Sequence, residues 1–146
     1  MKTIDKDEAR KQLSRLEKEV SKLREIIDQP EYSVKDIKSL DDACDILGEN
    51  KRYFMDASTS KRLKTIIKAA NFIANGGEVW IPDFTNRNKY KFIPYFERKA
   101  SGWVAYFVSY CYSSSGYPLG FYFKNREDAE YISKQFIDLY NTWLEE

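Results

Sequence analysis

Two consecutive glycines, Gly76 and Gly77, divide the sequence into two parts that favour different secondary structures. Before them, apolar residues recur at helical spacing; after them, aromatic and β-branched residues dominate as far as Phe123. A glycine pair also ends a helix, because glycine readily adopts the left-handed conformation that closes the last turn. This change of pattern predicts an α+β chain, with helices and an antiparallel sheet in separate stretches of sequence.

The first helix is expected at residues 6–28, where apolar residues follow the a and d positions of a heptad repeat. These positions are occupied by Leu13, Leu16, Val20, Leu23 and Ile27. β-branched residues at a with leucine at d favour two parallel helices, and Glu19 and Arg24 would then attract each other between chains. A helix this short needs support, either from a second copy of the chain in a homodimer or small oligomer, or from its own domain.

Pro30 ends this helix, because proline removes a backbone donor and clashes with the preceding turn. The sequence therefore predicts three parts. They are a heptad helix at 1–29, a linker at 30–38 and an α+β domain at 39–146.

Three helices are expected in the domain. Ser39 is an N-cap for a short helix that ends before Gly48, and a longer helix follows at about 60–75. The last begins after Asn125 and continues to the end of the chain. Its apolar stripe comprises Ala129, Ile132, Phe136, Leu139 and Trp143, and we expect this stripe to pack on one face of the sheet.

Between these helices we expect a four-stranded antiparallel meander. Its strands are predicted at 78–84, 90–98, 103–112 and 119–123. Pro82 and Pro94 indicate edge-like or bulged positions in the first two strands, because proline cannot donate to a neighbouring strand.

Simple alternation divides the strand at 103–112 into two faces, neither of which is polar. One face carries Trp103, Ala105, Phe107 and Cys111, and the other carries Val104, Tyr106, Val108, Tyr110 and Tyr112. The first face fits a core covered by helices. The tyrosine face is either covered by the N-terminal segments or exposed as a protein-binding patch, a dimer face or a stacking platform for bases.

The net charge of +1 conceals an uneven distribution of charge. Residues 51–126 contain 13 basic and 4 acidic residues, whereas both ends of the chain are acidic. In the predicted strands and turns, candidate cations for a binding surface are Arg87, Lys89, Lys91, Arg98 and Lys99. Together with Tyr106, Tyr110 and Tyr112 they form the predicted binding residues.

Several classes of chemistry find no support in the sequence. The chain has no histidine, which removes Ser-His and Cys-His nucleophile pairs and most zinc sites. Asp83, Asn86 and Asn88 do not have the spacing of a calcium loop. We therefore expect no enzyme activity, no metal and no cofactor.

The expected compartment is the cytoplasm, because the N-terminus has no signal-peptide pattern and no apolar run is long enough to span a membrane. In that compartment Cys44 and Cys111 are expected to be reduced, and we expect both to be buried.

From about residue 39 to the end, the sequence resembles a family of small uncharacterised proteins encoded by phages and prophages of gut bacteria. The resemblance rests on four segments, SLDDACDILG, GGEVWIPDF, KYKFIPYF and LGFYFKNREDAEYISKQFIDLY. The heptads are outside it. The resemblance implies a phage accessory protein and assigns no catalytic residue.

These observations favour a non-enzymatic protein that binds a host or phage protein, such as a defence or replication factor, through an aromatic, basic sheet surface. The alternative is a protein that binds single-stranded nucleic acid by stacking bases on tyrosines and neutralising phosphates with its basic turns.

Overall fold

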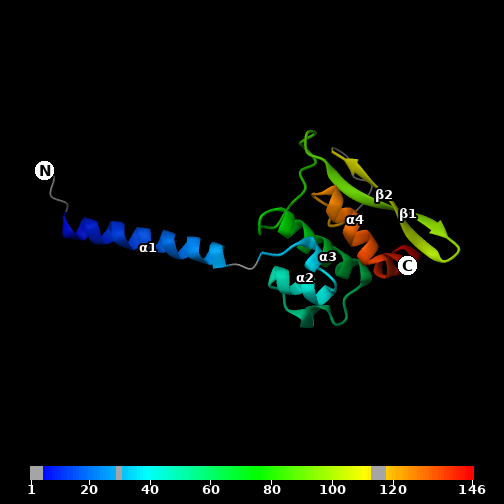
Figure 1. Cartoon of the computed structure of the whole chain (residues 1–146), viewed down its shortest axis with the longest axis horizontal. Coiled ribbons are helices and arrows are strands. Elements are labelled where there is room, and N and C mark those ends of the chain that lie inside the picture. The colour runs from blue at the N-terminus through cyan, green and yellow to red at the C-terminus, as the bar shows by residue number, and fades with distance from the viewer. Residues whose placement is uncertain (1–4, 29–30, 113–117) are drawn as a thin grey trace. The chain divides into compact units, whose positions relative to one another are not determined.

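The computed structural model describes residues 5–28, 31–112 and 118–146. The chain divides into two compact units, Met1–Glu31 and Tyr32–Glu146 (Figure 1). The first unit is built on α1 (Lys6–Asp28), the helix predicted at 6–28. None of its described residues is buried, including all five a and d residues.

The second unit begins within the segment predicted to be a linker. A short 3-10 helix, η1 (Val34–Asp36), is capped by Ser33, and Ile37 is completely buried. The Tyr131 hydroxyl donates to the carbonyls of Lys35 or Ile37, each 3.2 Å away. These contacts attach the segment to the domain, so that much of the predicted linker is domain structure.

Helices α2 (Leu40–Leu47) and α3 (Thr59–Ala74) form where the sequence predicts them, joined by a 3-10 turn, η2 (Lys51–Phe54). Ser39 caps α2 by accepting from the backbone N–H of Asp42, and Gly48 closes it in the left-handed conformation. α3 contributes much of the core through Leu63, Ile66, Ile67 and Ala70.

The sheet has two strands, β1 (Lys91–Lys99) and β2 (Gly102–Cys111), paired antiparallel. The predicted four-stranded meander is therefore wrong, although the α+β class holds. The segment at 119–123 contributes a single bridge, from Phe123 to Phe92. The next hydrogen-bonded pair in the same register would join Phe121 to Pro94, and Pro94 has no N–H to donate, which stops the third strand after one pair.

The segment at 78–84 also forms no strand. Pro82 has no backbone N–H, so the segment lacks one of the donors that a strand needs. Its other groups make contacts outside a sheet. The carbonyl of Asp83 accepts from the Lys91 ammonium, and the Phe84 ring packs edge-on against Tyr122 with 5.2 Å between ring centroids.

The predicted final helix is two helices, α4 (Arg126–Gln135) and α5 (Ile137–Glu145), separated where the buried Phe136 leaves helical dihedral angles. α4 contacts both strands and α5 contacts β2, while the same helices contact α3 (Figure 1). Asn125 occupies the N-cap position of α4, but its side chain makes no capping bond. The core therefore lies between α3 and the hairpin and includes Ala129, Ile132 and Phe136.

Both cysteines are free thiols, and one differs from expectation. Cys44 is fully buried in α2, whereas Cys111 is half-buried because it is the last residue of β2. Burial raises the pKa of both thiols above the ordinary value.

Candidate interaction surface

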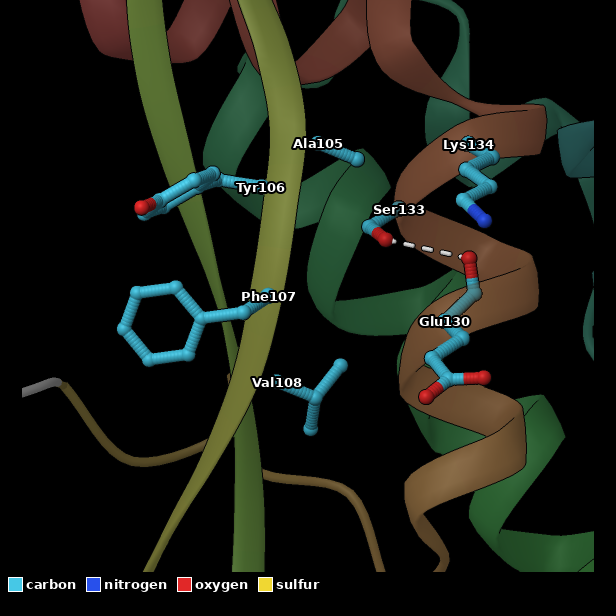
Figure 2. Close-up of a pocket in the computed structure, with 7 residues that line it drawn as sticks. All are labelled: Ala105, Tyr106, Phe107, Val108, Glu130, Ser133 and Lys134. Carbon is cyan, nitrogen blue, oxygen red and sulfur yellow. Dashed lines mark hydrogen bonds between the residues drawn. The ribbon is translucent and has the colours of Figure 1, made fainter.

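A β-bulge at Tyr106 decides which side chains of β2 are displayed. Tyr95 is paired with Phe107 and Phe96 with Ala105, so that Tyr106 is an extra residue without a partner on β1. Figure 2 shows the consequence, with Tyr106 and Phe107 both directed away from α4 and Ala105 and Val108 directed toward it. Simple alternation predicted the opposite faces for Phe107 and Val108, and it put Tyr106 on one face with Tyr110 and Tyr112. That assignment is wrong, because the bulge reverses the alternation beyond it and places Tyr110 on the face of Val108, opposite Tyr106.

On the face away from α4, three aromatic side chains form what we call the outer cluster: Tyr95, Tyr106 and Phe107. The rings of Tyr95 and Phe107 stack, with centroids 4.9 Å apart and planes within 1°. Tyr106 meets Phe107 edge-on at 5.0 Å and is 65% exposed. Three aromatic rings in contact with each other and with solvent form a compact apolar patch on a rigid ladder.

On the other face, where β1 begins and β2 ends, a second set forms what we call the tyrosine group: Tyr90, Tyr110 and Tyr112. The centroid of Tyr90 lies 4.7 Å from that of Tyr110 and 6.2 Å from that of Tyr112. All three are exposed, Tyr110 by 52%. The guanidinium of Arg126 lies nearby, 5.2 Å above the ring of Phe92, which is paired with Tyr110.

Of the five predicted cations, Lys91 does not belong to a surface. It is only 1% exposed, and its ammonium donates to the carbonyls of Asp83 and Tyr112 and lies 5.1 Å above the ring of Phe84. The side chain therefore ties the 83–90 turn to the hairpin. Its position at the start of a strand beside Tyr90 gave no sign of this burial.

The other four cations separate into two pairs. Arg87 and Lys89 are exposed in the turn before β1, while Arg98 and Lys99 are at its far end. Arg98 is paired with Glu145, with 3.3 Å between guanidinium nitrogen and carboxylate oxygen. About nine strand residues separate the two pairs, or roughly 30 Å. The basic residues thus form no continuous stripe beside the tyrosines.

Two buried or half-buried amides hold the hairpin in place. Asn141 of α5 accepts from the N–H of Trp103 at 2.7 Å and donates to its carbonyl at 2.8 Å. Asn71 of α3 does the same for the segment beside β1, by donating to the Tyr122 carbonyl and accepting from the Lys124 N–H. These bonds attach both edges of the hairpin region to the helices. They hold in place the strands that carry the aromatic side chains.

Two clefts border the hairpin and its flanking segments. A groove of about 190 Å³ separates β2 from α4, and a cleft of about 580 Å³ lies between the 80–92 segment and Lys124. In the second cleft the Lys124 ammonium is already occupied by Asn75, 3.1 Å away. Across the described residues, no group of three or more acidic or cysteine side chains is placed to hold a metal ion.

The described helices also include none with the length and hydropathy needed to cross a membrane.

The sequence prediction named Tyr106, Tyr110 and Tyr112, which are exposed. It did not name Tyr90, Tyr95 and Phe107, whose rings contact theirs or each other. A signal for the bulge was present, because the consecutive aromatics Tyr106 and Phe107 interrupt any clean alternation in β2. The heptad residues Leu13, Leu16, Val20, Leu23 and Ile27 share one stripe of α1, and they form a candidate surface separate from the hairpin.

Comparison of the chain with protein-family models, with curated proteins and with solved structures gave no match. The resemblance to phage proteins therefore stays a prediction.

Proposed function

We propose that this chain is a non-enzymatic accessory protein of phage type that binds a host or phage protein in the cytoplasm through the aromatic faces of its hairpin. The supporting observation is the arrangement of the outer cluster and the tyrosine group. These are six exposed aromatic side chains, four in the two-stranded ladder and two, Tyr90 and Tyr112, just beyond its end. Tyrosine and phenylalanine are enriched where proteins bind each other, because they bury large areas at small cost in side-chain entropy.

A protein partner is favoured over nucleic acid by the position of the cations. A single strand needs phosphate-binding cations interleaved with its stacking platforms. Of the five predicted cations, Lys91 is buried, Arg98 is paired with Glu145, and Lys99 stands at the far end of β1 from Arg87 and Lys89. Arg87, Lys89 and Arg126 lie near the tyrosine group, at one end of the hairpin, whereas the outer cluster lies in the middle of the ladder.

Assembly of the chain is proposed to occur through α1. The apolar stripe of α1 is exposed along its length and comprises Leu13, Leu16, Val20, Leu23 and Ile27. A heptad stripe of this kind becomes buried when two copies of the helix pair. A homodimer would present two hairpins to the partner, and two linked sites bind more tightly than one.

The proposal is tested by affinity capture from the bacterial cells in which the protein acts, using two variants. The double variant Tyr106→Ala and Phe107→Ala removes the outer cluster. Tyr53→Ala removes an equally exposed tyrosine from η2, outside the hairpin, and is the matched control. We expect one captured protein to be retained by the control and to bind the double variant at least about ten-fold more weakly, since central aromatic anchors contribute most of the binding energy.

The alternative function predicts a different result. If the chain binds single-stranded nucleic acid, a labelled oligonucleotide should show micromolar affinity that falls steeply with salt and is lost in the double variant. That outcome, together with no captured protein, would replace the proposed function by the nucleic-acid one.

A further inference from the structure

The edge of β2 that faces away from β1 has backbone groups available for a third strand. Phe92 and Phe123 exchange both of their backbone hydrogen bonds, at 2.9 and 2.8 Å, so the groups of Phe92 point away from β2. In an antiparallel ladder, two residues directly opposite each other either both point their backbone groups at the partner strand or both point them away from it. Tyr110 is opposite Phe92, so its N–H and C=O point away from β1. The same alternation applies two residues earlier, to Val108 opposite Pro94.

The rest of this edge is partly closed by side chains. Asn141 occupies both backbone groups of Trp103, and the Arg126 guanidinium donates to the Val108 carbonyl at 2.7 Å. In the described part of the chain, no backbone or side-chain group hydrogen-bonds to the N–H of Val108 or to either backbone group of Tyr110. An extended backbone is the natural complement to such a row of groups.

Space for side chains of an added strand lies on the α4 side of β2. The groove of about 190 Å³ has Ala105 to Val108 as one wall and Glu130, Ser133 and Lys134 of α4 as the other (Figure 2). Side chains of an added strand would alternate between this groove and the side of the outer cluster. Tyr106 and Phe107 belong to the β2 segment that lines this groove, and their rings project from its opposite face (Figure 2).

The charges along the edge favour an acidic occupant. Arg126 is within ion-pair distance of no carboxylate in the described residues, and Lys134 is exposed on the groove wall against a single acid, Glu130. A second copy of β2 is a poorer occupant. A symmetric pairing through Val108 and Tyr110 would place the two Arg126 side chains close together, and like charges repel.

We propose that the partner protein binds by adding an extended acidic segment to the free edge of β2, opposite β1. This inference rests on the proposed function, since it names the part of the partner that the hairpin binds. Backbone hydrogen bonds to Val108 and Tyr110 would set its direction and register, and Arg126 and Lys134 would select acidic side chains on the groove side.

The test uses a synthetic fluorescent peptide of about nine residues in which glutamate alternates with valine and threonine, titrated against the full chain by anisotropy. Two companion peptides are compared with it, one with lysine in place of glutamate and one methylated at alternate backbone nitrogens. We expect each change to weaken binding by about ten-fold or more, because the first reverses the charge and the second removes hydrogen-bond donors.

Protein variants test the same edge from the other side. Val108→Pro removes an N–H that β1 does not use, and Val108→Ala is its control, since it keeps that N–H. We expect the proline variant to lose about ten-fold in affinity relative to the alanine variant, with circular dichroism confirming that both are folded. Arg126→Gln supplies a second reading that leaves the backbone of β2 unaltered, and it should also weaken binding of the acidic peptide.

Equal binding of the methylated peptide, or no binding of any peptide, would overturn strand addition. The proposed function fails separately, when the Tyr106 and Phe107 double variant captures the same protein as the wild type. If instead the chain associates with itself through this edge, sedimentation of the Val108→Pro variant would show the loss of that association, and the second-copy reading would replace the acidic segment.

Discussion

At the residue scale, the most consequential side chains are polar ones placed where an apolar residue would be expected. The buried amide of Asn71 bonds the backbone of two residues in the 121–124 segment, and the buried ammonium of Lys91 bonds the turn before β1. In each case one side chain bonds backbone groups that a neighbouring strand would bond in a larger sheet. Neither role follows from local sequence, because asparagine and lysine are mostly surface residues.

Asp128, in the first turn of α4, gives stability a dependence on pH. Burial raises the pKa of its carboxyl from 3.8 to about 6, and the neighbouring Glu127 adds to the effect. Between pH 4 and 6 the unfolded chain therefore loses this proton before the folded chain does. Stability should be greatest below about pH 4, as far as this group is concerned, and should fall as the pH rises to about 6.

Replacing this carboxyl should remove that loss. We expect Asp128→Asn to stabilise the protein at pH 7 by about 1–3 kcal/mol, an estimate that allows for the favourable position of an acid near a helix N-terminus. The exposed Asp138 in the first turn of α5 is the matched control. Urea unfolding at pH 4 and pH 7 measures both, and equal pH dependence in the wild type and Asp128→Asn would contradict the assignment.

Among the secondary-structure elements, β2 contains a bulge whose effect on side-chain display can be distinguished from its effect on folding. Without Tyr106, the remaining residues of β2 alternate regularly and keep Ala105, Val108 and Tyr110 on the face where they now lie. The alternation of the other β2 residues therefore does not depend on Tyr106. We infer that the bulge is retained for what it displays, namely Tyr106 beside Phe107.

Single-residue deletions test this directly. Deleting Tyr106 should change the free energy of unfolding by less than about 1 kcal/mol and should weaken partner binding. Deleting Ser109 is the control, because it forces either Tyr110 to the opposite face or Phe107 into the buried position of Val108, at a cost of about 1–3 kcal/mol. A Tyr106 deletion at least as destabilising as the Ser109 deletion would show that the bulge is structural.

The same elements show how far sequence reasoning reaches. Caps and periodicity located α1, α2 and α3, because these signals are local to each helix. The number of strands could not be obtained in this way, since it depended on which residue faces Pro94 across the sheet. The surface was identified in part from the tyrosines of β2, while the bulge and the burial of Lys91 depend on contacts distant in sequence.

At the scale of the whole molecule, the chain combines an exposed heptad helix with a domain that displays aromatic side chains. α1 has 23 residues, and a solitary helix of that length with an uncovered apolar stripe is marginal in water. Pairing of two copies would stabilise it.

Light scattering tests this pairing. The full chain is expected to be a dimer at concentrations of tens of micromolar, and a chain that begins at residue 32 is expected to be a folded monomer. Leu16→Glu and Leu23→Glu should have the effect of the truncation, whereas Lys18→Ala, off the stripe, should not. A full-length monomer would rule the pairing out.

Site-specific photo-crosslinking shows whether the hairpin's aromatic surface contacts a protein partner. A photoreactive phenylalanine analogue replaces Tyr106 in one version of the chain and Tyr53, which is 73% exposed on η2, in another. Irradiation in cells should give one discrete protein adduct from position 106 and none from position 53. Adducts that are equal at the two positions, or absent from position 106 while the protein is folded and present, would contradict that contact.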